Sequence, residues 1–370
     1  MEPATLRRFA ETLRAEHASA PRGASEAPFV VSAAVYRDAE RCARERRLVE
    51  RTPRIVAASS EIAPGTAIAI DIPGTSAIVS RTPDGTLRAF ANACRHRGTR
   101  LVDTPCTKAI VCPYHAWTYD LDGRLVHVPH RETFGALPLA DRGLVALPVS
   151  ERAGLVWLGD AAAHAEPIAP DLDALGLARH VVWRRARVER RCNWKLVVEA
   201  FLDGYHIRVL HRDSVYQFFL DAAFVAERAG PHMRAMTARR ALVEAPGLDA
   251  LGAPELRQLG TPSFFVAPAT TIVVHPDFVS VIVVDPVAPD RTTWEHVMLI
   301  PAERAGETEH WTRSWALIED RVFQREDLWV CEQIQRSIDA GATNELVFGS
   351  LETPVRWFHE ALARALAEVT

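Results

Sequence analysis

Two short cysteine–histidine motifs constrain this chain more than any other feature. Cys94-x-His96 and Cys112-x-x-His115 are separated by the fifteen residues from 97 to 111. Two thiolates and two imidazoles at these spacings are a metal-ligand set, so the chain has to fold with both motifs against one metal centre. Short β-type runs with turn residues between them surround the motifs, which predicts ligand loops held between strands.

The ligand set fits two kinds of metal centre. A structural zinc site uses two cysteines and two histidines, and a Rieske [2Fe–2S] centre holds one iron by two cysteines and the other by two histidines. Zinc fingers usually continue into a helix after their last ligand, whereas Thr118-Tyr119 is strand-like. Gly98 and Pro113 allow tight loops, and Trp117 can cover the centre. The flanks therefore favour the iron–sulfur centre over zinc.

A second metal signal lies in Asn193–His211, which reads NWKLVVEAFLDGYHIRVLH. His206 and His211 with a distant carboxylate would form the facial triad that holds non-haem Fe(II) and leaves positions open for oxygen. On an uninterrupted helix the two histidines would point ~140° apart. Both can bind one ion only if the helix ends or bulges between them. The alternative is two core histidines with no metal.

The same stretch carries two carboxylates. Glu199, Asp203 and His206 are spaced four and three residues apart, so they share one face if the stretch is helical. A buried carboxylate is costly without a partner, and Asp203 is expected to bind the free ring nitrogen of a ligand histidine. Pairing of Asp203 with Arg208 or Arg212 is the alternative, although surface ion pairs contribute little.

The third iron ligand is expected on a late helix. Asp327, Cys331, Ile334 and Ile338 are spaced four, three and four, so Asp327 extends an apolar stripe that faces inward. Glu326 aligns instead with a mostly polar face. We therefore predict Asp327 as the ligand and interpret Glu326 as a solvated or linking acid.

Together these motifs resemble the large (α) subunit of Rieske non-haem iron oxygenases, the ring-hydroxylating type, from about Val35 onward. The resemblance rests on the two cysteine–histidine loops and on N-W-K followed by E…D-x-Y-H and a second histidine. It implies a [2Fe–2S] cluster and Fe(2+), and its residues carry over one by one. Cys94 and Cys112 would hold one cluster iron, His96 and His115 the other, and His206, His211 and Asp327 the Fe(2+). One departure is Ala116, where the family usually has glycine.

The resemblance also implies two catalytic roles. Asp203 would carry electrons between His115 of a neighbouring subunit and His206. Asn193 resembles a family residue beside the iron. Position alone makes Phe201, Leu202, Leu210 and Phe323 candidates for the substrate pocket, with core packing as the alternative.

The order of expected elements indicates an α+β fold in three parts. Residues 1–55 form an N-terminal helical segment that packs on the catalytic domain, with a linker at 20–28. Residues 56–158 form an all-β Rieske [2Fe–2S] domain. Residues 159–370 form the catalytic non-haem iron domain, which the resemblance makes a helix-grip (START/Bet v1-like) fold with an antiparallel sheet and a long C-terminal helix.

Composition limits the partners and the compartment. A net charge of −4 gives no sign of nucleic acid or an anionic membrane. The N-terminus has no signal-peptide core, and Phe278–Val284 is too short to span a bilayer. Six cysteines without a paired framework fit a reducing cytoplasm. No nucleotide-binding glycine motif is present, so an external NAD(P)H-dependent reductase, with or without a ferredoxin, would supply electrons. By resemblance, a homotrimer is expected.

We therefore expect an oxidoreductase that uses O₂ to hydroxylate an organic, aromatic substrate at the mononuclear iron, as a monooxygenase or a dioxygenase. The alternative within the family is a monooxygenase or N- or O-demethylase that acts on a methylated amine or ether. An electron carrier would need only residues 56–158, and the second ligand set argues against it. His275-Pro-Asp277 matches the H-x-D of 2-oxoglutarate oxygenases but is better interpreted as a hairpin turn.

Overall fold

The computed structural model describes residues 1–18, 27–245 and 247–368 and forms two compact units. The expected linker at 20–28 lies almost wholly outside the described residues. One unit is Glu50–Glu166. The other combines Met1–Val49 with the chain from Pro167 onward. Among the described residues no helix has both the length and the apolar character that a membrane span needs.

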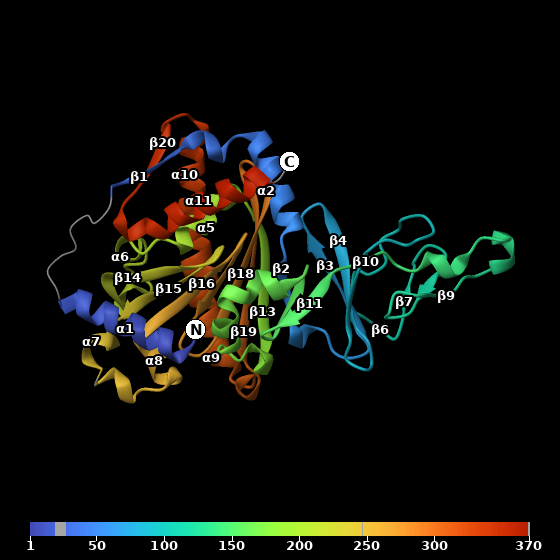
Figure 1. The fold of residues 1–370 in the computed structure, drawn as a ribbon, viewed down its shortest axis with the longest axis horizontal. Helices are drawn as coiled ribbons and strands as arrows, with labels where there is room; N and C mark the ends of the chain where they lie inside the picture. The colour runs from blue at the N-terminus through green and yellow to red at the C-terminus, as the bar shows by residue number, and fades with distance from the viewer. Residues whose placement is uncertain (19–26, 246, 369–370) are drawn as a thin grey trace. The chain divides into compact units, whose positions relative to one another are not determined.

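The smaller unit is built from short strands (Figure 1). Its main sheet has the order β10-β5-β4-β3-β6, and two three-stranded sheets have the orders β11-β12-β2 and β7-β8-β9. The strands are β2 (Arg54–Ala58), β3 (Thr66–Ile72), β4 (Thr75–Arg81), β5 (Leu87–Ala91), β6 (Cys106–Thr107), β7 (Ile110–Val111), β8 (Thr118–Tyr119), β9 (Leu125–His127), β10 (Ala146–Leu147), β11 (Val149–Arg152) and β12 (Leu155–Leu158). Both ligand motifs fall in loops between these strands, as predicted.

The larger unit contains a seven-stranded antiparallel sheet of order β13-β19-β18-β17-β16-β15-β14. The strands are β13 (His180–Arg190), β14 (Phe219–Ala229), β15 (His232–Arg239), β16 (Gly260–Val266), β17 (Thr270–Val274), β18 (Val279–Ala288) and β19 (Arg291–Pro301). A separate pair joins β1 (Phe29–Ser32) to β20 (Glu345–Phe348). Antiparallel sheets beside long helices confirm the α+β class.

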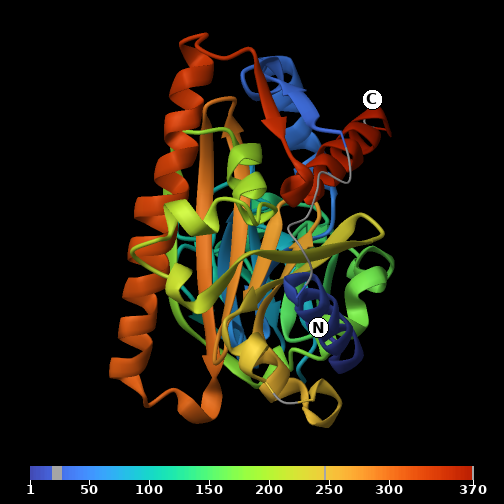
Figure 2. The same ribbon diagram turned by 90° about the vertical axis from the view of Figure 1, so that its left-hand side faces the viewer.

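A long helical segment accompanies this sheet. Helices α9 (Thr308–Trp315) and α10 (Leu328–Asp339) are joined by a π-helical stretch, Ala316–Asp327, and run as one continuous helix beside the strands (Figure 2). The other helices are α1 (Pro3–Ala18), α2 (Ala39–Arg51), α3 (Ala161–Ala165), α4 (Ala169–Asp173), α5 (Trp194–Phe201), α6 (Ile207–Leu210), α7 (Ala241–Glu244), α8 (Ala253–Leu259) and α11 (Thr353–Glu368).

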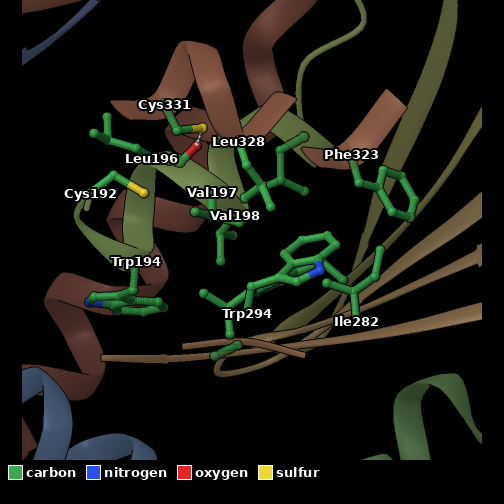
Figure 3. Close-up of a cluster of buried hydrophobic side chains, with 14 of the residues drawn as sticks. Cys192, Trp194, Leu196, Val197, Val198, Ile282, Trp294, Phe323, Leu328 and Cys331 are labelled. Carbon is green, nitrogen blue, oxygen red and sulfur yellow. Dashed lines mark hydrogen bonds between the residues drawn. The ribbon is translucent and has the colours of Figure 1, made fainter. Parts of the chain in front are cut away.

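Helix α5 lies in the core between the sheet and α10 (Figure 3). Val197 and Val198 are buried there, and Cys331 on α10 donates its thiol to the carbonyl of Leu196 at 3.3 Å. On the sheet side Trp294 packs against Phe323, with ring centroids 5.3 Å apart. The core therefore fixes the end of α5 against the π-helical stretch.

The N-W-K motif at the start of α5 is a structural anchor. The Asn193 side chain accepts from the Lys195 backbone N–H at 3.1 Å and caps the helix. The Lys195 ammonium lies 2.7 Å from the Glu45 carboxylate, and both side chains are fully buried. Glu45 also accepts from the Trp194 indole at 2.8 Å and pairs with Arg41. Helix α2 is thereby tied to α5.

Candidate metal centres and cavity

The smaller unit brings the four cysteine and histidine side chains of the two loops together. Cys94 and Cys112 are buried, and the rings of His96 and His115 are 4.7 Å apart. Trp117 stacks on His96 at 4.9 Å, as predicted from its place in the motif. The Tyr119 hydroxyl lies 3.4 Å from Cys94 Sγ. His115 is exposed, which leaves one histidine at the surface.

Each ligand loop has a residue with left-handed backbone conformation one or two positions after its histidine. Gly98 has φ 78°, and Ala116 has φ 55°. This conformation is costly for alanine because its Cβ crowds the following carbonyl. The departure at Ala116 is therefore a strained position. Nδ1 of His96 is buried without a hydrogen bond, and an orphaned buried nitrogen of this kind fits a metal ligand.

In the larger unit the histidine stretch is broken. Helix α5 ends at Phe201, and the short α6 starts directly after His206 and ends directly before His211. Gly204 lies in the break, where a Cβ would come within 2.7 Å of Phe224. Since each histidine flanks α6, the two Nε2 atoms approach to 3.2 Å. The helix does end between them, as the sequence required.

The third predicted residue joins this pair. Asp327 Oδ1 lies 3.2 Å from Nε2 of His211 and 3.7 Å from Nε2 of His206. Among the described residues, the ligand atoms of His206, His211 and Asp327 all lie within 4.8 Å of one another, close enough to hold one metal ion. Asp327 Oδ1 is buried and makes no hydrogen bond. Two imidazoles and such an oxygen fit a ferrous ion.

Each histidine is oriented by an acid on its other ring nitrogen. Nδ1 of His206 lies 3.1 Å from Asp203, and Nδ1 of His211 lies 2.7 Å from Glu326. The Ser214 hydroxyl donates to the same Glu326 oxygen at 2.7 Å. Burial lowers the pKa of His211, but Asp327 and Glu326 outweigh burial and raise it to about 9. Glu326 was interpreted as either a solvated or a linking acid. Its contacts to His211 and Ser214 support the linking acid.

Two further expectations for this region can be compared with the structure. Glu199, Asp203 and His206 do line one cavity, although α5 ends at Phe201 and the three do not lie on one continuous helix. Glu199 also accepts from the Tyr36 hydroxyl at 2.8 Å and lies 2.8 Å from Nε2 of His359. The Asn193 amide donates to the carbonyls of Tyr36 and Pro289 at 2.9 and 2.7 Å. These contacts make Asn193 a helix cap, and they give no support to a place beside the iron.

A cavity of about 230 Å³ opens on the three converging side chains. Its apolar wall is rich in phenylalanine, from Phe201, Phe218, Phe219, Phe224, Phe278 and Phe323. Phe201 and Phe323 were predicted pocket residues. Leu202 is instead buried in the core, and Leu210 lines a second cavity of about 370 Å³ that shares Asp203, His206 and Asp327 with the first.

The polar wall of the first cavity was not predicted. It comprises Thr237, Arg239, Thr261, Ser263, His275 and Ser314. The four of them in β15 and β16 alternate with core residues. This period of two in the sequence was the available sign that they share one face of the sheet. The sequence could not tell which face of each strand would meet the cavity.

His275 is held at the end of a buried hydrogen-bond chain. Its Nε2 lies 3.1 Å from the Ser280 hydroxyl, Ser280 lies 2.9 Å from His296, and His296 lies 2.9 Å from Glu319. Burial, with the nearby His296 and Arg239, lowers the pKa of His275 to about 3, so it meets the cavity as a neutral ring. Asp277 binds His310 at 2.6 Å, and H-x-D forms no metal site here.

Comparison with known proteins agrees with both centres. Residues 52–144 match the Rieske [2Fe-2S] domain, and residues 177–368 match the catalytic domain of the ring hydroxylating alpha subunit. Two loops for an iron–sulfur cluster and a helix-grip domain with a histidine–carboxylate centre define a Rieske non-haem iron protein. The chain belongs to the family of ring-hydroxylating oxygenase α subunits, whose cofactors are a [2Fe–2S] cluster and Fe(2+).

Relatives of known activity include two enzymes of methylated amines. The carnitine monooxygenase oxygenase subunit of Acinetobacter pittii is 27% identical over 296 residues, 76% of this chain and 78% of the relative. The glycine betaine monooxygenase oxygenase subunit of Chromohalobacter salexigens is 31% identical over 208 residues, 53% of this chain but only 46% of the relative.

Solved structures share the fold. A quaternary ammonium Rieske monooxygenase in complex with an inhibitor has a TM-score of 0.78 at 22% identity, covering 91% of this chain and 95% of its own. Naphthalene 1,2-dioxygenase from Rhodococcus sp., bound to indole, has a TM-score of 0.76 at 20% identity and covers 99% of both chains. The same fold therefore serves enzymes of methylated amines and of aromatic rings.

Proposed function

We propose that this protein is a Rieske oxygenase that hydroxylates a small organic substrate in the 230 Å³ cavity. In this proposal Cys94, His96, Cys112 and His115 hold the [2Fe–2S] cluster, and His206, His211 and Asp327 hold Fe(2+). When bound, these groups supply electrons and the redox chemistry with O₂. The observation that carries the proposal is the convergence of the three ligand atoms at the wall of a cavity lined by phenylalanine.

The cavity limits the size of the substrate. An engineered apolar cavity of roughly 150 Å³ holds benzene, so about 230 Å³ suits one substituted ring or an aliphatic molecule of similar size. The phenylalanine wall provides apolar surroundings in which a substrate can be held close to the metal. An aromatic substrate fits this wall by stacking.

Electron entry is assigned to Asp203. Its carboxylate lies 3.1 Å from Nδ1 of His206 and lines both cavities. Tyr205 and Val209 beside it are exposed apolar side chains at 68% and 72%, as expected of a surface that another subunit covers. We therefore favour a homotrimer in which the exposed His115 of one subunit delivers electrons to Asp203 of the next. A separate reductase, with or without a ferredoxin, would reduce the cluster in a cytoplasmic setting.

A second candidate is a monooxygenase or demethylase of a methylated amine or ether. The carnitine and glycine betaine relatives support it, and aromatic faces also attract quaternary ammonium groups.

Single-turnover assays with reduced protein and ¹⁸O₂ separate the candidates. Two labelled atoms in one product indicate a dioxygenase, and one labelled atom in a ring product indicates a monooxygenase. Release of formaldehyde from a methylated substrate indicates a demethylase. Consumption of O₂ only as peroxide with every aromatic, amine and ether tested would contradict the proposed function.

A further inference from the structure

Arg239 is a cation in the wall of the cavity that forms no ion pair with an acid among the described residues. It is the last residue of β15, and its best polar contact is a 3.4 Å hydrogen bond from Nη1 to the Thr261 hydroxyl. Over residues 1–18, 27–245 and 247–368, no carboxylate forms an ion pair with it. Because a poorly solvated cation without a partner is costly, this position calls for an anion from outside the chain.

The acid whose charge acts on Arg239, Asp277, already has other partners. Burial lowers the pKa of Arg239 and attraction to Asp277 opposes that effect, but guanidinium remains charged at any physiological pH. Asp277 itself binds His310 at 2.6 Å and lies 3.7 Å from Arg304. Asp277 therefore reduces the cost of burying Arg239 without saturating its donors.

The guanidinium is also held in place. It lies over the rings of Phe218 and Phe219, at 5.3 and 5.4 Å from their centroids. Stacking on aromatic rings orients a guanidinium and leaves its N–H edge free for a planar acceptor.

Hydroxyl groups surround this edge of the cavity. Thr237 is two residues before Arg239 on the same face of β15. Thr261 on β16 is the direct cross-strand partner of Thr237. Ser263 follows on the same face of β16. A fixed guanidinium with nearby hydroxyl donors and no ion-paired acid among the described residues is a donor set for a carboxylate.

We infer that Arg239 binds a carboxylate of the substrate, which makes the substrate a small organic acid. This inference rests on the proposed function for the identity of the cavity as the substrate site. The anchored acid would direct the other end of the molecule toward the histidine–aspartate centre across the phenylalanine wall. An aromatic acid and a methylated amino acid such as a betaine both offer this group, whereas a plain amine or an unsubstituted ring does not.

Binding calorimetry with matched ligand pairs tests the inference. The reduced holoenzyme is titrated without oxygen with benzoate against benzamide, and with glycine betaine against choline, since each pair differs in the carboxylate. We expect the acid of at least one pair to bind ~10-fold or more tightly than its neutral or cationic partner, as charge-assisted pairs require. The pair that responds tells the aromatic acid from the betaine.

Variants assign the effect to Arg239. Arg239→Gln should weaken binding of the preferred acid by ~10–100-fold and leave its neutral partner unchanged. Arg313→Gln is the control, because Arg313 is an exposed arginine of α9 paired with Glu309. If Arg239→Gln fails to fold, the comparison of ligand pairs on the wild-type protein still tests whether the cavity selects carboxylates.

Two outcomes separate this inference from the proposed function. Equal binding of acids and their partners, or an unchanged acid affinity in Arg239→Gln, would overturn the carboxylate site even if the enzyme oxygenates neutral compounds. Selective binding of acids through Arg239 with no oxygen incorporated into any of them would support the site and contradict the oxygenase.

Discussion

Glu326 gives the sharpest test of how the iron site is supported. One of its oxygens receives both the His211 ring N–H and the Ser214 hydroxyl, each at 2.7 Å. Acids that orient a metal-bound histidine typically contribute 10–100-fold to metal affinity, which corresponds to ~1.4–2.7 kcal/mol. Glu326→Gln keeps an oxygen acceptor but removes the charge, so we expect a loss near 10-fold in Fe(2+) affinity. Glu326→Ala also leaves the two donors without their acceptor, so we expect a loss nearer 100-fold.

Anaerobic competition with a coloured ferrous chelator measures this affinity. The visible spectrum of the [2Fe–2S] cluster reports protein concentration in the same sample. Ser214→Ala is the matched control, because it removes one donor to Glu326 but leaves the contact to His211 intact. It should change the affinity only a few-fold.

The ordering of the variants is the critical result. Wild-type iron affinity in Glu326→Ala would show that the 2.7 Å contact does not support His211. A loss in Ser214→Ala as large as that in Glu326→Ala would refute the assignment of the effect to the histidine contact.

Four further predictions follow from the same structure. Asp203→Ala should keep the cluster but bind Fe(2+) more weakly, because His206 loses its orienting acid; with Fe(2+) supplied in excess it should still lose turnover, and normal steady-state activity would remove Asp203 from electron transfer. His206→Ala should lose the mononuclear iron in metal analysis while the visible spectrum of the cluster is retained; full iron content would exclude it as a ligand. Lys195→Met should lower the free energy of unfolding by ~3 kcal/mol, since it leaves the buried Glu45 charge with fewer partners; urea denaturation showing a loss under ~1 kcal/mol would contradict this. Ala116→Gly should raise the stability of the Rieske domain by a few tenths to ~1 kcal/mol, because relief of the left-handed strain exceeds the entropy cost of glycine; a lower midpoint in thermal denaturation followed at the cluster absorbance would show that the position is unstrained.

The sequence predicted those features that depend on local pattern. The two cysteine–histidine loops and the strands around them follow from turn residues and short apolar runs. The inward face of Asp327 follows from its spacing to Cys331 and Ile338 on one helix, and Asp327 and both of these are buried. Helical geometry also required a helix to end or bulge between His206 and His211, and α6 ends at Leu210, directly before His211.

Features that depend on distant partners could not be predicted. Glu199 contacts Tyr36 and His359, which lie 163 and 160 residues away in the chain, and its spacing to Asp203 gave no sign of these partners. In the sequence, Arg239 is one more charged residue at the end of a strand. Only the fold shows that it lines the cavity. The strength of the contact between Glu326 and His211 depends on the π-helical winding before it, and local sequence carries no clear signal for that winding.

That winding has a consequence for insertions and deletions. Two consecutive acids reach two different nitrogens of one imidazole, Glu326 at Nδ1 and Asp327 at Nε2. The wider turn persists up to them, since the Leu328 N–H bonds to the carbonyl of Phe323 five residues back. Removing one residue upstream would swing both acids by ~100° relative to the preceding turns, even though every side chain needed at the site would still be encoded. The number of residues in this helix is therefore under as tight a constraint as the identity of its acids.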